Sequence, residues 1–130
     1  MMPDFSAPVF WRWCFWICLL AVLALSVMHP SPHMPTTGWD KTNHLLAFAV
    51  LALLGCRAHP DRSALVLALL LAYGGLIELL QSLTSDRFAE LADLLADGVG
   101  LCLGWGVARL LNRLGRRNGT DALERASRSS

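Results

Sequence analysis

The chain has 130 residues, of which 55% are hydrophobic and 16% are charged, and its formal net charge is +1. Soluble domains carry about 25% charged residues, and eight of the 21 charged residues here lie within residues 109–128. This composition excludes an intrinsically disordered chain, and the small net charge provides no broad basic face for a nucleic acid. We therefore expect a single all-α, polytopic membrane domain rather than a soluble globule.

Four segments approach the roughly 20 apolar residues that a helix needs to cross the hydrocarbon layer of a bilayer. They lie at about residues 10–28, 39–56, 63–83 and 88–111. The third segment contains one charged residue, Glu78, and the fourth is polar at its beginning. The segments predict a bundle of four transmembrane helices that occupies residues 1–113.

Polar sequences separate these four segments. Residues 29–35 contain three prolines, so no helix continues through them. Short polar sequences at 57–62 and 82–87 are typical of turns between antiparallel helices. Residues 114–130 are rich in arginine, serine and glycine, and we expect them to form a basic, disordered tail.

The first apolar segment has a signal peptide as its alternative interpretation. Residues 24–26, Ala-Leu-Ser, resemble a small-residue cleavage site. However, the apolar stretch is long for the core of a signal peptide, and Arg12 is the only basic residue at its start. We therefore expect the first helix to be retained.

Basic residues indicate the orientation, because lysine and arginine near the ends of spans favour the cytoplasm. With four spans, the N-terminus, the turn at 57–62 and the C-terminal tail lie on one side and carry nine arginines. The other side carries only Lys41 and Arg87. We therefore expect both termini to be cytoplasmic.

The polar residues of the spans gather on the outer side under this topology. They are Asp40, Lys41 and His44 at the start of the second span, Glu78 and Gln81 at the end of the third, Arg87 in the next loop, and Asp93 and Asp97 at the start of the fourth. Spacings of three or four residues place the members of each set on one helix face. A charge at the bilayer centre costs at least about 2.5–3.5 kcal/mol, so we expect these side chains to face one another rather than lipid.

Small residues continue the same face of the fourth segment. Gly100 and Gly104 form a GxxxG motif, which lets another helix approach closely. The approaching helix can belong to the same chain or to a second copy, so the sequence leaves a homodimer through Gly100 and Gly104 open.

Three motifs follow one another at the ends of the predicted spans. They are Asp40-Lys41-x-x-His44-x-x-x-Phe48, Gly75-x-x-Glu78-x-x-Gln81 and Arg87-x5-Asp93-x3-Asp97-x2-Gly100-x3-Gly104. Together they resemble the VanZ-like family of small membrane proteins over about residues 37–108. The resemblance implies a bacterial inner-membrane protein that acts near the cell surface. One difference is Asp97, where the family usually has asparagine, and it adds an acid to the predicted site.

Two interpretations of the outer polar residues compete. A buried network could simply fix the register of the helices, or a pocket could hold a lipid headgroup or a cell-envelope precursor. We favour the pocket because intramembrane ionisable residues usually mark function and a packing network would balance its charges better. In such a pocket we expect Lys41 and Arg87 to hold an anionic group of the ligand. The three acids would accept hydrogen bonds from its hydroxyl or amine groups; they are Glu78, Asp93 and Asp97. His44 and Gln81 would orient the groups that take part in these hydrogen bonds.

Two further hypotheses remain. A membrane-embedded enzyme could act on a lipid-linked substrate with His44 as its general acid or base, although the sequence assigns no catalytic residue. An ion pathway is disfavoured because the inner half of the predicted bundle has few polar residues. The four cysteines form no CxxC motif, and phosphate-loop and dinucleotide motifs are missing from the sequence. We therefore expect no metal and no cofactor.

Overall fold

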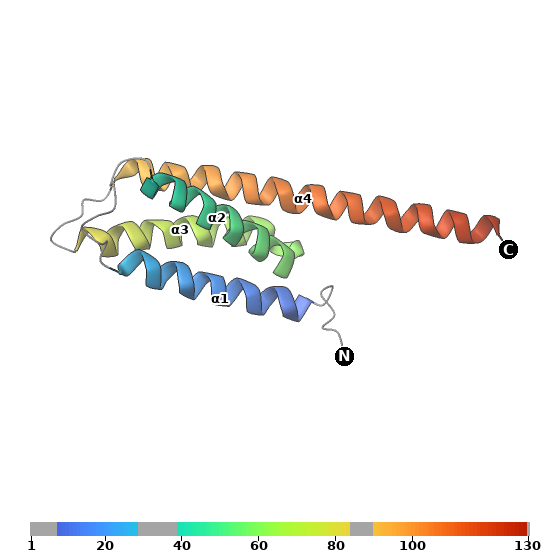
Figure 1. The fold of residues 1–130 in the computed structure, drawn as a ribbon, viewed down its shortest axis with the longest axis horizontal. Helices are drawn as coiled ribbons and strands as arrows, with labels where there is room; N and C mark the ends of the chain where they lie inside the picture. The colour runs from blue at the N-terminus through green and yellow to red at the C-terminus, as the bar shows by residue number, and fades with distance from the viewer. Residues whose placement is uncertain (1–7, 29–38, 84–89, 130) are drawn as a thin grey trace.

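The computed structural model describes residues 8–28, 39–83 and 90–129, and within them it contains four α-helices (Figure 1). These are α1 (Pro8–Val27), α2 (Trp39–Ala58), α3 (Ser63–Ser82) and α4 (Leu91–Arg128), with a short 3-10 turn, η1 (Pro60–Arg62), between α2 and α3. Figure 1 shows α1, α2, α3 and the first part of α4 side by side, while the rest of α4 extends beyond them. The predicted all-α, four-helix bundle is confirmed.

Three of the described helical segments are long and apolar enough to cross a membrane. They are Pro8–Val27, Pro60–Ser82 and Leu91–Arg128, with mean hydropathies of 1.9, 2.1 and 1.5 over their best windows. A 20-residue helix is about 30 Å long, which matches the hydrocarbon layer. The protein is therefore a multi-pass membrane protein.

Helix α2 is not one of these three segments, and it lies among the other helices. It contacts α1, α3 and α4, and its Phe48, Leu51 and Ala52 are almost completely buried. Its neighbours thus shield much of its surface from lipid. Such a position allows α2 to carry a polar residue, His44, in its second turn.

The turn between α2 and α3 follows from a single proline. Pro60 cannot continue α2 because it lacks a backbone N–H group. The chain instead forms η1, and the Ser63 hydroxyl donates a hydrogen bond of 3.1 Å to the carbonyl oxygen of Pro60. The helices α2 and α3 form the antiparallel hairpin that the sequence predicts.

Helices α2 and α4 pack closely through the two glycines of the GxxxG motif. A Cβ atom at Gly100 would collide with the carbonyl oxygen of Leu45, and one at Gly104 would collide with that of Ala49. Both glycines are buried. The motif therefore serves contact within one chain, and a homodimer through the same face would have to displace α2.

Two side-chain hydrogen bonds attach α1 to α3. The Tyr73 hydroxyl donates to the Leu19 carbonyl oxygen at 2.7 Å, and the Gln81 amide donates to the Ser26 carbonyl oxygen at 3.0 Å. The second bond lies at the end of α1, one residue before Val27. These bonds place the C-terminal ends of α1 and α3 next to each other.

Helix α4 continues to Arg128, which differs from the disordered tail expected for residues 114–130. The described residues from Arg109 onward are all exposed, so this part adds no buried residue to the core. Its arginine, leucine, alanine and glutamate residues have high helix propensity, and the helix already formed before residue 109 removes the cost of nucleation.

Candidate functional site

Four buried polar side chains meet at one end of the bundle. His44 comes from the second turn of α2, Glu78 from the last turns of α3, and Asp93 and Asp97 from the first turns of α4. Their exposed fractions are 8%, 7%, 7% and 0%, respectively. We call these four residues the polar cluster. The structure thus brings together residues that lie as far as 53 positions apart in the sequence.

The centre of the polar cluster is a hydrogen bond between His44 and Asp97. Nδ1 of His44 lies 2.9 Å from Oδ1 of Asp97. A carboxylate only accepts hydrogen bonds, so we assign the imidazole tautomer in which Nδ1 donates to Asp97. The ring of Phe48 stacks parallel to the imidazole with a centroid distance of 6.5 Å. The imidazole is therefore held in a defined orientation.

Gly74 makes room for Asp97 on the neighbouring helix. A Cβ atom at Gly74 would lie 2.5 Å from Oδ2 of Asp97 and 3.2 Å from the ring of Phe48. Any larger residue at position 74 would push the carboxylate out of its place. Oδ2 itself is buried and accepts no hydrogen bond from the described residues.

Glu78 uses only one of its two carboxylate oxygens. Its Oε2 accepts a hydrogen bond of 3.2 Å from the backbone N–H of Glu90, just before α4 begins. Its Oε1 is buried and has no hydrogen-bond partner among the described residues. A buried carboxylate oxygen without a hydrogen-bond partner is costly, and it requires an explanation such as a bound water, ion or ligand.

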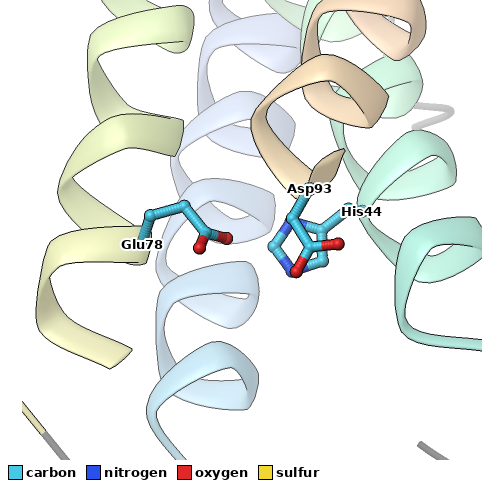
Figure 2. A group of neighbouring side chains, drawn as sticks. All are labelled: His44, Glu78 and Asp93. Atoms are coloured by element: carbon cyan, nitrogen blue, oxygen red, sulfur yellow. The ribbon is translucent and has the colours of Figure 1, made fainter. Parts of the chain in front are cut away.

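The side chains of His44, Glu78 and Asp93 point toward one another. Figure 2 shows the carboxylate of Glu78 directed at the imidazole of His44, and the carboxylate of Asp93 overlaps the ring in this view. One possible ligand atom from each residue lies within 4.8 Å of the other two. Nitrogen and carboxylate oxygen atoms in such an arrangement can bind either hydrogen-bond donors or a cation.

A protein-family model matches most of the chain and identifies its family. The family model described as VanZ/LLP1 matches residues 4–112, which include α1, α2, α3, the first part of α4 and the whole polar cluster. The chain belongs to the VanZ/LLP1 family. Comparison with curated proteins and with solved structures gives no match.

An ion pair borders the polar cluster of this VanZ/LLP1 protein. Nζ of Lys41 lies 3.1 Å from Oε2 of Glu90, and both side chains are about half exposed. Glu90 was not among the predicted site residues, although it binds Glu78 through its backbone and Lys41 through its side chain. Its position immediately before α4 is the sequence feature that could have indicated this role.

The remaining predicted site residues have different outcomes. Gln81 is buried, but its amide binds the carbonyl oxygen of Ser26 on α1 rather than the polar cluster. The side chain of Asp40 and all of Arg87 lie outside the described residues. Lys41 is at the edge of the site, as its sequence position indicates.

The opposite end of the VanZ/LLP1 bundle is basic. The guanidinium of Arg57 lies 4.6 Å from the ring centre of Trp11, and that of Arg109 lies 5.0 Å from that of Trp105. A surface hollow of about 400 Å³ between the end of α2 and the middle of α4 includes Arg57 and Arg116. The acidic polar cluster and the arginines are thus separated along the length of the bundle.

Proposed function

We propose that this VanZ/LLP1 protein binds the polar headgroup of a lipid or of a lipid-linked cell-envelope precursor at its polar cluster. The observation that carries the proposal is the buried Oε1 of Glu78, which has no hydrogen-bond partner among the described residues. A hydroxyl or amine group of a ligand would satisfy this oxygen. Intramembrane ionisable residues usually mark a functional site, which supports the same interpretation.

The chemistry of the polar cluster favours a ligand rich in hydrogen-bond donors. Its three carboxylates face a single imidazole, and carboxylates only accept hydrogen bonds. Lys41 lies at the edge of the site, where its ammonium group could contact the phosphate of a headgroup. A headgroup with hydroxyl or amine groups on one side and a phosphate on the other fits this arrangement.

The orientation that we propose places the polar cluster on the outer side of a bacterial inner membrane. Lysine and arginine near span ends favour the cytoplasm, and Arg57, Arg62 and Arg109 lie at the end of the bundle opposite the polar cluster. The arginines of the last part of α4 add to the same side. Both chain termini are then cytoplasmic.

Lipid retained during purification tests the proposal. We expect wild-type protein in mild detergent to retain one lipid class, identified by mass spectrometry, and Glu78→Gln to retain at least about tenfold less of it. A hydrogen bond to a charged group contributes about 1.5–3 kcal/mol, and 1.4 kcal/mol corresponds to a factor of ten.

The matched control for this experiment is Asp61→Asn, which removes an exposed carboxylate in η1 at the opposite end of the bundle. It should retain lipid as the wild type does. Equal lipid retention by Glu78→Gln and wild type, or no retained lipid class in the wild type, would contradict the proposal.

The hydrogen bond between His44 and Asp97 supports a second candidate, an enzyme that acts on a lipid-linked substrate. A carboxylate at 2.9 Å from Nδ1 orients the imidazole and would stabilise its protonated form, as a general acid or base requires. Turnover of such a lipid by purified wild-type protein, lost in His44→Gln, would favour the enzyme over simple binding. If the lipid is unchanged after prolonged incubation, binding remains as the proposed function and the enzyme is contradicted.

A further inference from the structure

We propose that the polar cluster binds a divalent first-row transition-metal ion through His44, Glu78 and Asp93. This inference goes beyond lipid binding and does not depend on it. It also departs from the expectation of no metal, because the three residues come from three helices and form no local sequence motif. One possible ligand atom of each residue lies within 4.8 Å of the other two.

The state of Glu78 is an independent observation that points to a bound cation. Its side chain is 7% exposed, and its Oε1 has no hydrogen-bond partner among the described residues. Figure 2 shows this carboxylate directed at His44 and Asp93. A metal ion between the three side chains would give Oε1 of Glu78 a partner.

The hydrogen bond of His44 to Asp97 prepares the imidazole to bind a metal. Since Nδ1 donates to Asp97, Nε2 is the nitrogen that would ligate the ion. Metal-binding histidines commonly donate their other ring N–H to a carboxylate, which fixes the tautomer and makes the ligand more basic. Asp97 would therefore act as a positioning residue, held in place by the close approach of Gly74.

The residue types indicate the class of ion and leave room for a ligand. Imidazole nitrogen with carboxylate oxygens suits Zn²⁺, Mn²⁺ or Fe²⁺ better than Cu⁺, which prefers sulfur. Bonds of about 2.0–2.2 Å require the three atoms to draw closer together, which rotation of the Glu78 and Asp93 side chains allows. Three protein ligands leave an open coordination position, which a phosphate oxygen could occupy.

Direct metal binding by the full-length protein tests this inference. Protein without a polyhistidine tag, purified in detergent and stripped with a chelator, is titrated with Zn²⁺, Mn²⁺ and Co²⁺ by equilibrium dialysis. We expect one equivalent per chain for at least one ion, and visible absorption bands if Co²⁺ enters the site. Wild-type protein that binds none of the three would overturn the proposal, whatever the variants do.

Variants locate the bound ion. Glu78→Gln and Asp93→Asn should each weaken binding by at least about tenfold, and Asp97→Asn by about 10–100-fold, as expected for removal of the carboxylate partner of a metal-binding histidine. Asp61→Asn is the matched control, since it removes an exposed carboxylate in η1 at the opposite end of the bundle. Unchanged affinity in both Glu78→Gln and Asp93→Asn would place the ion elsewhere and overturn the assignment.

The outcomes separate metal binding from lipid binding. Wild-type protein that retains lipid but binds no metal would overturn only the metal site. Wild-type protein that binds one metal ion but retains no lipid would overturn only the proposed function. Gel filtration and helical content confirm that each variant compared is folded.

Discussion

Gly104→Ala is expected to destabilise the protein, whereas Gly106→Ala on the same helix is expected to leave its stability unchanged or raise it. A Cβ atom at position 104 would collide with the carbonyl oxygen of Ala49 and would lie 2.8 Å from Cβ of Ala52, whereas nothing lies within 4 Å of one at position 106. Because backbone atoms cannot move aside as a flexible side chain can, α2 and α4 would have to separate. Overpacking of this kind costs about 1–3 kcal/mol.

The control is informative because alanine is ordinarily the better helix former. In a helix interior alanine is favoured over glycine by about 0.8–1.0 kcal/mol. The two variants should therefore shift the unfolding midpoint in detergent in opposite directions, or at least by clearly different amounts. Equal shifts would show that α2 and α4 do not pack through Gly104.

His44→Leu is expected to have the largest effect on stability. The substitution removes the hydrogen-bond donor of Asp97, whose side chain is completely buried. Removing the donor leaves a buried carboxylate oxygen unsatisfied, which costs about 1–3 kcal/mol and more when the group is charged. The free energy of unfolding in mixed detergent micelles, measured with metal-free protein, tests this prediction.

A second substitution distinguishes the lost pair from a general packing defect. Asp97→Asn in the His44→Leu background removes the uncompensated charge while keeping the side-chain volume, so we expect it to recover much of the lost stability. The double-mutant cycle should then give a coupling energy well above the roughly 0.3–0.5 kcal/mol found for independent sites. Additive effects of the two substitutions would contradict direct coupling of His44 and Asp97.

The sequence predicts the helices of the bundle well because their signal is local. Apolar length marks three of the described helices, and proline marks the turn after α2. The gathering of His44, Glu78 and Asp93 also follows from topology, since antiparallel helices bring alternate ends together. Charged residues at the ends of consecutive spans must then meet on one side.

Other features depend on which helix faces which, and local patterns do not determine this. The GxxxG motif predicts a close contact, but only the structure shows that α2 makes it. Gln81 lies three residues after Glu78 in the sequence, yet its amide donates a hydrogen bond to the carbonyl oxygen of Ser26 on α1. The pairing of His44 with Asp97 likewise joins residues on two helices, so their separate spacings could not predict it.

The most direct test of a functional polar cluster is the stability of Glu78→Gln. Glutamine has nearly the same shape, and its side-chain oxygen can still accept the hydrogen bond from the Glu90 backbone. If Glu78 binds a ligand, removing its charge should leave the ligand-free protein as stable as the wild type or more stable. The reason is that residues placed for binding commonly lower the stability of the free protein. If Glu78 serves only packing, stability should fall.

The measurement is the free energy of unfolding of ligand-free, metal-free wild type and Glu78→Gln in the same detergent, with Gly104→Ala as the destabilised reference. We expect Glu78→Gln to unfold at or above the wild-type free energy while losing the retained lipid. A loss of stability comparable to that of Gly104→Ala, with lipid retention unchanged, would show that the polar cluster is a structural network and contradict its role as a binding site.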